Sequence, residues 1–118
     1  MPLLKINSSI QELDKTVLDD IHQEGAKALS SELGKSIDYV MVVVNLGSSM
    51  SFAQDSESPS AYLEVKNIGE LGTEVTQKLS GKLCEMVNRK LCVPQNRIYI
   101  EFQEAQRHKW GWDGKTFS

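Results

Sequence analysis

The sequence predicts an α/β (α+β) fold in which two β-α-β repeats form a four-stranded sheet with both helices on one face. Strand-like segments flank two amphipathic helical segments, so the order strand, helix, strand occurs twice. The two halves also keep a constant offset, because Leu4 and Leu63 lie 59 positions apart. The same offset separates Tyr39 and Ile98. Each helix is long enough to return the next strand parallel to the previous one, with a right-handed crossover.

Four segments have the residue pattern of strands. In order they are Leu3–Ser8, Tyr39–Leu46, Ala61–Asn67 and Arg97–Phe102. The first alternates an apolar with a mixed face, as a half-buried strand does. The second, YVMVVVNL, is β-branched and apolar, so we expect it to be buried on both faces. The Ser- and Gly-rich stretch from 47 to 59 is expected to be a loop with one brief strand at most. It separates the repeats, at about 2–46 and 61–102, and a tail, 103–118, follows them.

Two segments place apolar residues at three- and four-residue steps, the spacing of an amphipathic helix. The first ends before Gly34, which suits the left-handed residue that follows a helix. Its start is open between two capping residues, Ser9 and Asp14. The second runs from about residue 71 to 91, and Pro94 prevents its continuation.

Composition limits the classes of function. The 118 residues suffice for one domain, 1–118, with its own core. Thirteen basic and sixteen acidic residues give a net charge of −3, which argues against binding nucleic acid through its phosphates. We expect no membrane insertion, because no apolar run reaches about 18 residues, and no secretory signal, because the first ten residues turn polar too soon. Cys84 and Cys92 are too few for a disulfide framework, so we expect a cytoplasmic protein, with release without a signal peptide left open.

The predicted sheet has one uncovered face. If both helices lie on the other face, apolar residues of the second strand, such as Met41 and Val43, are left without cover. An exposed apolar sheet face is typical of a subunit interface. We therefore expect an obligate oligomer.

Pro2 follows the initiator Met1, and methionine is removed when the next residue is small. The mature chain is therefore expected to begin with proline, whose free amine is secondary. Apolar burial or a nearby cation lowers the pKa of an amine, and an amine with a pKa near neutral can act as a general base. The alternative is that Pro2 only begins an edge strand, where proline is tolerated.

Motifs along the whole chain resemble the macrophage migration inhibitory factor family. In order they are MPLLKIN at the start, Gly34-Lys35, Tyr39-Val40-Met41, Met50-Ser51-Phe52, Asn67-Ile68-Gly69, Arg97-Ile98-Tyr99-Ile100, Trp110-Gly111-Trp112 and Thr116-Phe117. The resemblance implies a homotrimer of β-α-β repeats. It also implies a keto–enol tautomerase of phenylpyruvate-like and dopachrome-like compounds, and vertebrate members are cytokines as well. We expect no cofactor and no metal.

The resemblance further implies a set of site residues. Pro2 matches the catalytic base, Lys35 a lysine that faces the substrate carboxylate, and Tyr99 a tyrosine supplied by the neighbouring subunit. From the residues alone, the favoured interpretation of Lys35 is a solvated charge at a helix end, and the alternative for Tyr99 is a cross-strand packing aromatic. The other positions implied around the pocket are Tyr39, Asn67, Ile68, Glu101, Trp110, Trp112 and Phe117.

Some positions depart from the best-known member. Glu101 replaces an asparagine, and its carboxylate either repels an acidic substrate or pairs with a cation of the site. Trp110 replaces a smaller aliphatic residue, and Lys66 replaces a histidine and adds a cation near the site. The redox CxxC pair is missing, because Ser60 and Leu63 stand at the matching positions. Thiol oxidoreductase chemistry is therefore not predicted.

Two classes of function remain open. The first is a tautomerase that takes a small aromatic keto or enol acid and uses Pro2 as its base. The second is a protein ligand that binds a receptor the sequence does not name. A third class, an inert structural subunit, leaves the combination of Pro2, Lys35 and the aromatic tail unexplained.

Overall fold

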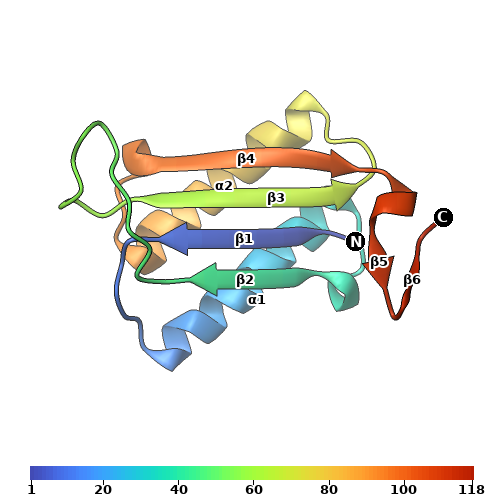
Figure 1. Ribbon diagram of the computed structural model, residues 1–118, viewed down its shortest axis with the longest axis horizontal. Helices are drawn as coiled ribbons and strands as arrows, with labels where there is room; N and C mark the ends of the chain where they lie inside the picture. Colours follow the sequence, from blue (N-terminus) through green and yellow to red (C-terminus); the bar gives the residue numbers. More distant parts are fainter.

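The chain folds as a four-stranded sheet with two long helices against one face, as Figure 1 shows for a computed structural model that describes residues 1–118. The strands are β1 (Leu3–Ser8), β2 (Met41–Asn45), β3 (Ala61–Ile68) and β4 (Ile98–Ala105), and the helices are α1 (Lys15–Leu33) and α2 (Thr73–Leu91). A hairpin of β5 (Gly111–Trp112) and β6 (Lys115–Thr116) follows, and 3-10 turns occupy Ile37–Tyr39, Gln95–Arg97 and Arg107–Lys109. Neither long helix is apolar enough to cross a membrane.

The sheet has the strand order β2-β1-β3-β4. β1 and β2 are parallel, as are β3 and β4, because a helix crosses over between the members of each pair. The two halves meet where β1 pairs antiparallel with β3, with Leu3 opposite Lys66. The predicted fold class, two β-α-β repeats with both helices on one face, is therefore confirmed.

Local capping sets the helix boundaries. α1 begins after Asp14, whose carbonyl oxygen accepts a hydrogen bond from Leu18 N at 3.0 Å, so the later of the two expected starts is correct. Gly34 follows α1 with a φ of +64°, a left-handed geometry that glycine adopts without strain. α2 begins at Thr73, slightly later than expected, and ends at Leu91 as expected.

The core lies between the sheet and the helices. Alternate residues of β1 and β3, including Leu4, Ile6 and Leu63, are fully buried there. The helices contribute the buried side chains of Ile21, Leu29, Leu79, Leu83, Met86, Val87 and Leu91. α1 approaches β1 so closely at Gly25 that an added Cβ atom would stand 2.8 Å from Leu4 Cδ2. This packing fixes β1 and, with it, the residues at the N-terminus.

The second strand differs from its prediction. Tyr39 lies in a 3-10 turn and not in a strand, because the Ser36 hydroxyl accepts a hydrogen bond from Asp38 N and caps that turn. β2 is an edge strand without a fully buried residue, so the expected burial on both faces is wrong for the single chain. Val42 packs against the core, whereas Met41 is 63% exposed on the side away from the helices.

The open face of the sheet is more polar than its second strand alone indicates. Glu64 of β3 lies 4.0 Å from the Lys5 ammonium and 3.8 Å from that of Lys66. Farther along, Tyr62 donates a hydrogen bond of 3.0 Å to Glu101. The middle of this face is therefore polar, while the exposed Met41 lies on the edge strand β2.

Arg97 anchors the loop that joins the two repeats. Its guanidinium donates hydrogen bonds of 2.9–3.1 Å to the main-chain oxygens of Phe52, Asp55, Ser58 and Pro59. The loop contains one isolated bridge, between Phe52 and Asp55, in agreement with the expected brief strand. The Phe52 ring packs edge-on against Tyr99 of β4, with 5.1 Å between ring centroids. Arg97 thus fixes the position of Phe52, which packs against Tyr99.

Candidate active site

Pro2 is buried immediately before β1, at the end of the sheet that also carries the β5–β6 hairpin (Figure 1). Its carbonyl oxygen accepts a hydrogen bond from Met41 N at 3.2 Å, which ties it to β2. Leu3 lies opposite Lys66 in the antiparallel pairing, so one further step places Pro2 opposite Asn67. Strand pairing on both sides therefore fixes the position of Pro2.

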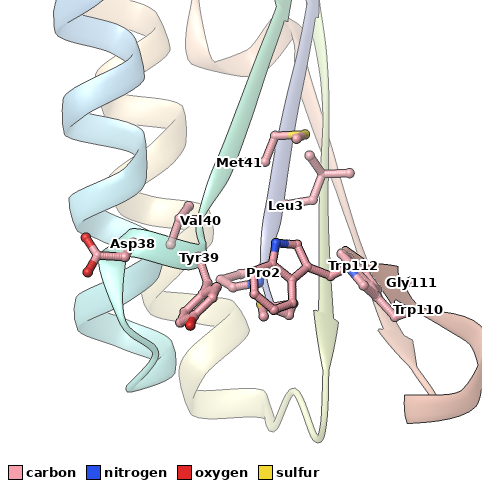
Figure 2. Close-up of a pocket in the computed structure, with 10 residues that line it drawn as sticks. Pro2, Leu3, Asp38, Tyr39, Val40, Met41, Trp110, Gly111 and Trp112 are labelled. Atoms are coloured by element: carbon pink, nitrogen blue, oxygen red, sulfur yellow. The ribbon is translucent and has the colours of Figure 1, made fainter. Parts of the chain in front are cut away.

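A first cavity of about 250 Å³ opens beside Pro2. It is lined by Met1, Pro2, Leu3, Asp38, Tyr39, Val40, Met41, Trp110, Gly111 and Trp112. Figure 2 shows the rings of Tyr39 and Trp112 near Pro2, while the Asp38 carboxylate points away from both. The two rings meet edge to face, with centroids 5.6 Å apart. This cavity is suited to an aromatic ring.

A second cavity, of about 180 Å³, contains the cations. It is lined by Met1, Lys35, Ser36, Tyr39, Ile68, Arg107 and Phe117. Met1 and Tyr39 line both cavities, so the two spaces adjoin at the N-terminus. Neither Lys35 nor Arg107 forms an ion pair with a carboxylate of the chain. An apolar space thus lies next to a space with two uncompensated positive charges.

The surroundings of the N-terminus change its acidity. Burial, and then the positive charge of Lys35, lowers the pKa of the Met1 ammonium below its ordinary value. Both effects disfavour the charged form of an amine. The site therefore favours a neutral amine at the chain terminus.

The aromatic tail is held by a hairpin that sequence reasoning missed. β5 and β6 are joined by Asp113 and Gly114, with φ angles of +53° and +80°. Asp-Gly is a strong signal for such a two-residue turn, so this part of the fold was readable from the sequence. The hairpin stacks Trp112 on Phe117, with 6.3 Å between centroids and 12° between planes. It brings the residues implied at the tail to the N-terminus.

The structure brings most of the predicted site residues together. The first cavity is lined by Pro2, Tyr39, Trp110 and Trp112. The second is lined by Lys35, Tyr39, Ile68 and Phe117. Asn67 lines neither cavity, but it is buried opposite Pro2, and its Oδ1 atom has no hydrogen-bond partner.

Three further predicted positions line neither cavity of the single chain. Tyr99 is 66% exposed and contacts Phe52 at the opposite end of β4. Glu101 pairs with neither cation of the site, because its carboxylate accepts the hydrogen bond from Tyr62. Lys66 pairs with Glu64 on the open face and lines neither cavity. Arg107, which sequence reasoning missed, lines the second cavity together with Lys35.

This combination of β-α-β repeats and Pro2 beside a cavity is that of the tautomerase-fold class. The family model described as Macrophage migration inhibitory factor (MIF) matches residues 1–118. The chain belongs to this family. It is 32% identical to the Macrophage migration inhibitory factor homolog of Trichinella spiralis, over 99% of this chain and 100% of the relative. The crystal structure of the homologue from Prochlorococcus marinus is similar, with a TM-score of 0.91, 35% identity, and coverage of 98% of this chain and 99% of that one. The Toxoplasma gondii protein is similar too, with a TM-score of 0.90, 28% identity, and coverage of 98% and 99%.

Proposed function

We propose that the chain is a keto–enol tautomerase of aromatic 2-oxo acids in which Pro2, freed by removal of Met1, is the general base. The observation that carries this proposal is the position of the N-terminus, because Met1 lines both cavities and Pro2 is buried beside it. Removal of Met1 leaves the secondary amine of proline facing the joined space. An apolar ring site lies on one side of that amine and a cationic site on the other.

A base must be neutral when the substrate arrives. We expect the burial and the Lys35 charge that lower the pKa of the Met1 ammonium to act in the same direction on the amine of Pro2, the next residue along the chain. A lowered pKa increases the neutral fraction of the amine near pH 7. Such an amine can take a proton and return it within one turnover.

The proposed reaction moves one proton. The substrate ring lies in the first cavity, against Tyr39 and Trp112, and its carboxylate faces Lys35 in the second. The Pro2 nitrogen removes a proton from the carbon next to the ketone, and the C–H electron pair forms the enol double bond. Negative charge builds on the ketone oxygen, where a hydrogen-bond donor stabilises it. The prolinium then returns its proton to that oxygen, so atoms and charge balance.

We further propose that Tyr99 serves the site of a neighbouring subunit in a homotrimer. Tyr99 pairs with Tyr62 in the sheet, five positions along β3 from the residue opposite Pro2. At about 3.3 Å per residue, these positions are roughly 16 Å apart. Tyr99 therefore cannot contact a small substrate at Pro2 in its own chain, and its exposed ring is available to another.

Insertion of Ala between Met1 and Pro2 tests the base. The insertion turns the proline nitrogen into an amide, which cannot accept a proton, and leaves the rest of the surface unchanged. Phenylpyruvate tautomerisation should fall about 10²–10⁴-fold while the chain stays folded. Pro2→Gly should lose less, because it keeps a terminal amine. An insertion variant that keeps more than about a tenth of the turnover would exclude Pro2 as the base.

The second class of function, a cytokine-like protein ligand, rests on family membership alone, since the family name describes a factor that inhibits macrophage migration. The Ala insertion separates the two classes. Binding to a receptor protein should survive it, whereas base catalysis should not.

A further inference from the structure

Arg107 lies in the second cavity although it is far from Lys35 in the sequence. It begins the 3-10 turn Arg107–Lys109, between β4 and the tail hairpin. Its Nε atom donates a hydrogen bond of 3.0 Å to the carbonyl oxygen of Phe117, and this bond holds the guanidinium in place. The two Nη groups form no hydrogen bond or ion pair within the chain. Arg107 therefore presents a held, uncompensated planar cation to the cavity that contains Lys35.

We propose that Arg107 is a specificity-determining residue that binds the substrate carboxylate together with Lys35. The proposal rests on the proposed function and names the group that the second cavity selects. A guanidinium offers parallel N–H donors that match the two oxygens of a carboxylate, whereas an ammonium acts as a point charge. The pair thus selects a 2-oxo acid over its neutral ester or amide.

The two cavities match the two ends of such a substrate. The first cavity has the aromatic rings of Tyr39 and Trp112, and the second has both cations. An aryl-substituted 2-oxo acid has its ring and its carboxylate at opposite ends, with the reacting carbon between them. With the carboxylate in the second cavity and the ring in the first, the reacting carbon lies beside the chain terminus.

Charge supports the same assignment. The whole chain has a net charge of −3, which repels an acidic substrate at long range. Asp38 is the one carboxylate that lines either cavity, and it points away from Pro2 (Figure 2). The two unpaired cations therefore create a local positive potential in the second cavity, which attracts the carboxylate end of an acidic molecule.

The test uses binding, so that it does not depend on catalysis. The ligands are 3-phenylpropionate and its amide, which share a ring and differ in charge. The protein is the full chain with its mass showing that Met1 is removed, and dissociation constants come from titration calorimetry. Arg107→Gln removes the charge and keeps an amide N–H for the Phe117 carbonyl. Lys109→Gln, in the same turn but outside both cavities and all ion pairs, is the matched control.

The wild-type chain should bind the acid more tightly than the amide. Arg107→Gln should raise the dissociation constant of the acid about tenfold to a hundredfold, the range for hydrogen bonds to a charged group. The dissociation constant of the amide should stay unchanged. Arg107→Lys should recover part of the loss, and Lys109→Gln should match wild type. Equal weakening of acid and amide by Arg107→Gln would show a merely structural role and overturn the inference. An unchanged acid-to-amide ratio, or no preference in the wild type, would overturn it as well.

These outcomes stay distinct from those for the base. A mature chain that binds the acid through Arg107 but does not tautomerise phenylpyruvate would refute the proposed base and keep the carboxylate site. An unchanged kcat/KM for phenylpyruvate in Arg107→Gln would keep the base and refute the carboxylate site.

Discussion

Arg97→Ala should loosen the loop that joins the two repeats and, through it, the placement of Tyr99. The guanidinium donates four hydrogen bonds to main-chain oxygens, and only 12% of the side chain is exposed. It also lies 5.5 Å from the centroid of the Phe52 ring. A hydrogen bond between neutral groups contributes a net of about 0.5–1.5 kcal/mol and one from a charged donor more, but water replaces part of the loss at the surface. We therefore expect a decrease of about 2–4 kcal/mol in the free energy of unfolding.

The assay is urea unfolding at fixed protein concentration, because oligomerisation makes the apparent stability depend on concentration. Arg97→Lys is the matched variant, since it keeps the charge but cannot reach all four oxygens. It should lose less stability than Arg97→Ala. Turnover of phenylpyruvate should fall in both variants, because Phe52 packs against Tyr99. A change of less than about 1 kcal/mol for Arg97→Ala would refute the anchoring role.

Three other predictions concern packing, acidity and assembly. Gly25→Val should destabilise the chain by about 1–3 kcal/mol in thermal or urea unfolding, because its Cβ atom would stand 2.8 Å from Leu4 Cδ2; an unchanged stability would contradict the close packing of α1 on β1. Lys35→Gln should shift the rising limb of the pH–rate profile to higher pH, because Lys35 is one of the two causes that lower the pKa of the terminal amine, and a limb that stays in place would show that burial alone sets it. Sedimentation should give a trimer of the 13.2 kDa chain, and mixing Pro2→Gly with Tyr99→Phe chains should restore activity through whole mixed sites. A monomer, or no recovery after proven subunit exchange, would contradict the shared site.

Periodicity made the main elements predictable. Apolar residues alternate in Leu3–Ser8 and recur at helical spacing up to Leu33, because one side of each segment faces the core. In the structure the core covers that apolar side of each segment. Tyr39 was misplaced because its aromatic ring favours a strand, while the local hydrogen bond to Ser36 closes a 3-10 turn around it.

Residues of the site were predictable only where they belong to a motif of the family resemblance. Lys35 and the tail aromatics were named through the family resemblance and not through spacing, and they do line the cavities. Glu101 and Arg107 could not be placed, because each depends on a partner that only the fold brings near. For Glu101 the partner is Tyr62, and for Arg107 it is the end of the tail hairpin.

The open face of the sheet shows the same limit. The apolar run of the second strand indicated an apolar face, but three further strands share that face. Ion pairs of Glu64 with Lys5 and Lys66 cover its middle. A single strand cannot predict the character of a face to which four strands contribute.

The most direct measurement of the central claim is the rate of phenylpyruvate tautomerisation by a chain whose mass shows that Met1 is removed, recorded from pH 5 to pH 9. We expect turnover that rises with pH and levels off, because only the neutral Pro2 amine accepts a proton and the surroundings of the N-terminus lower the pKa of the terminal amine. The same chain with Met1 retained should be inactive. Equal turnover with and without Met1, or no turnover by the mature chain at any pH, would contradict the account.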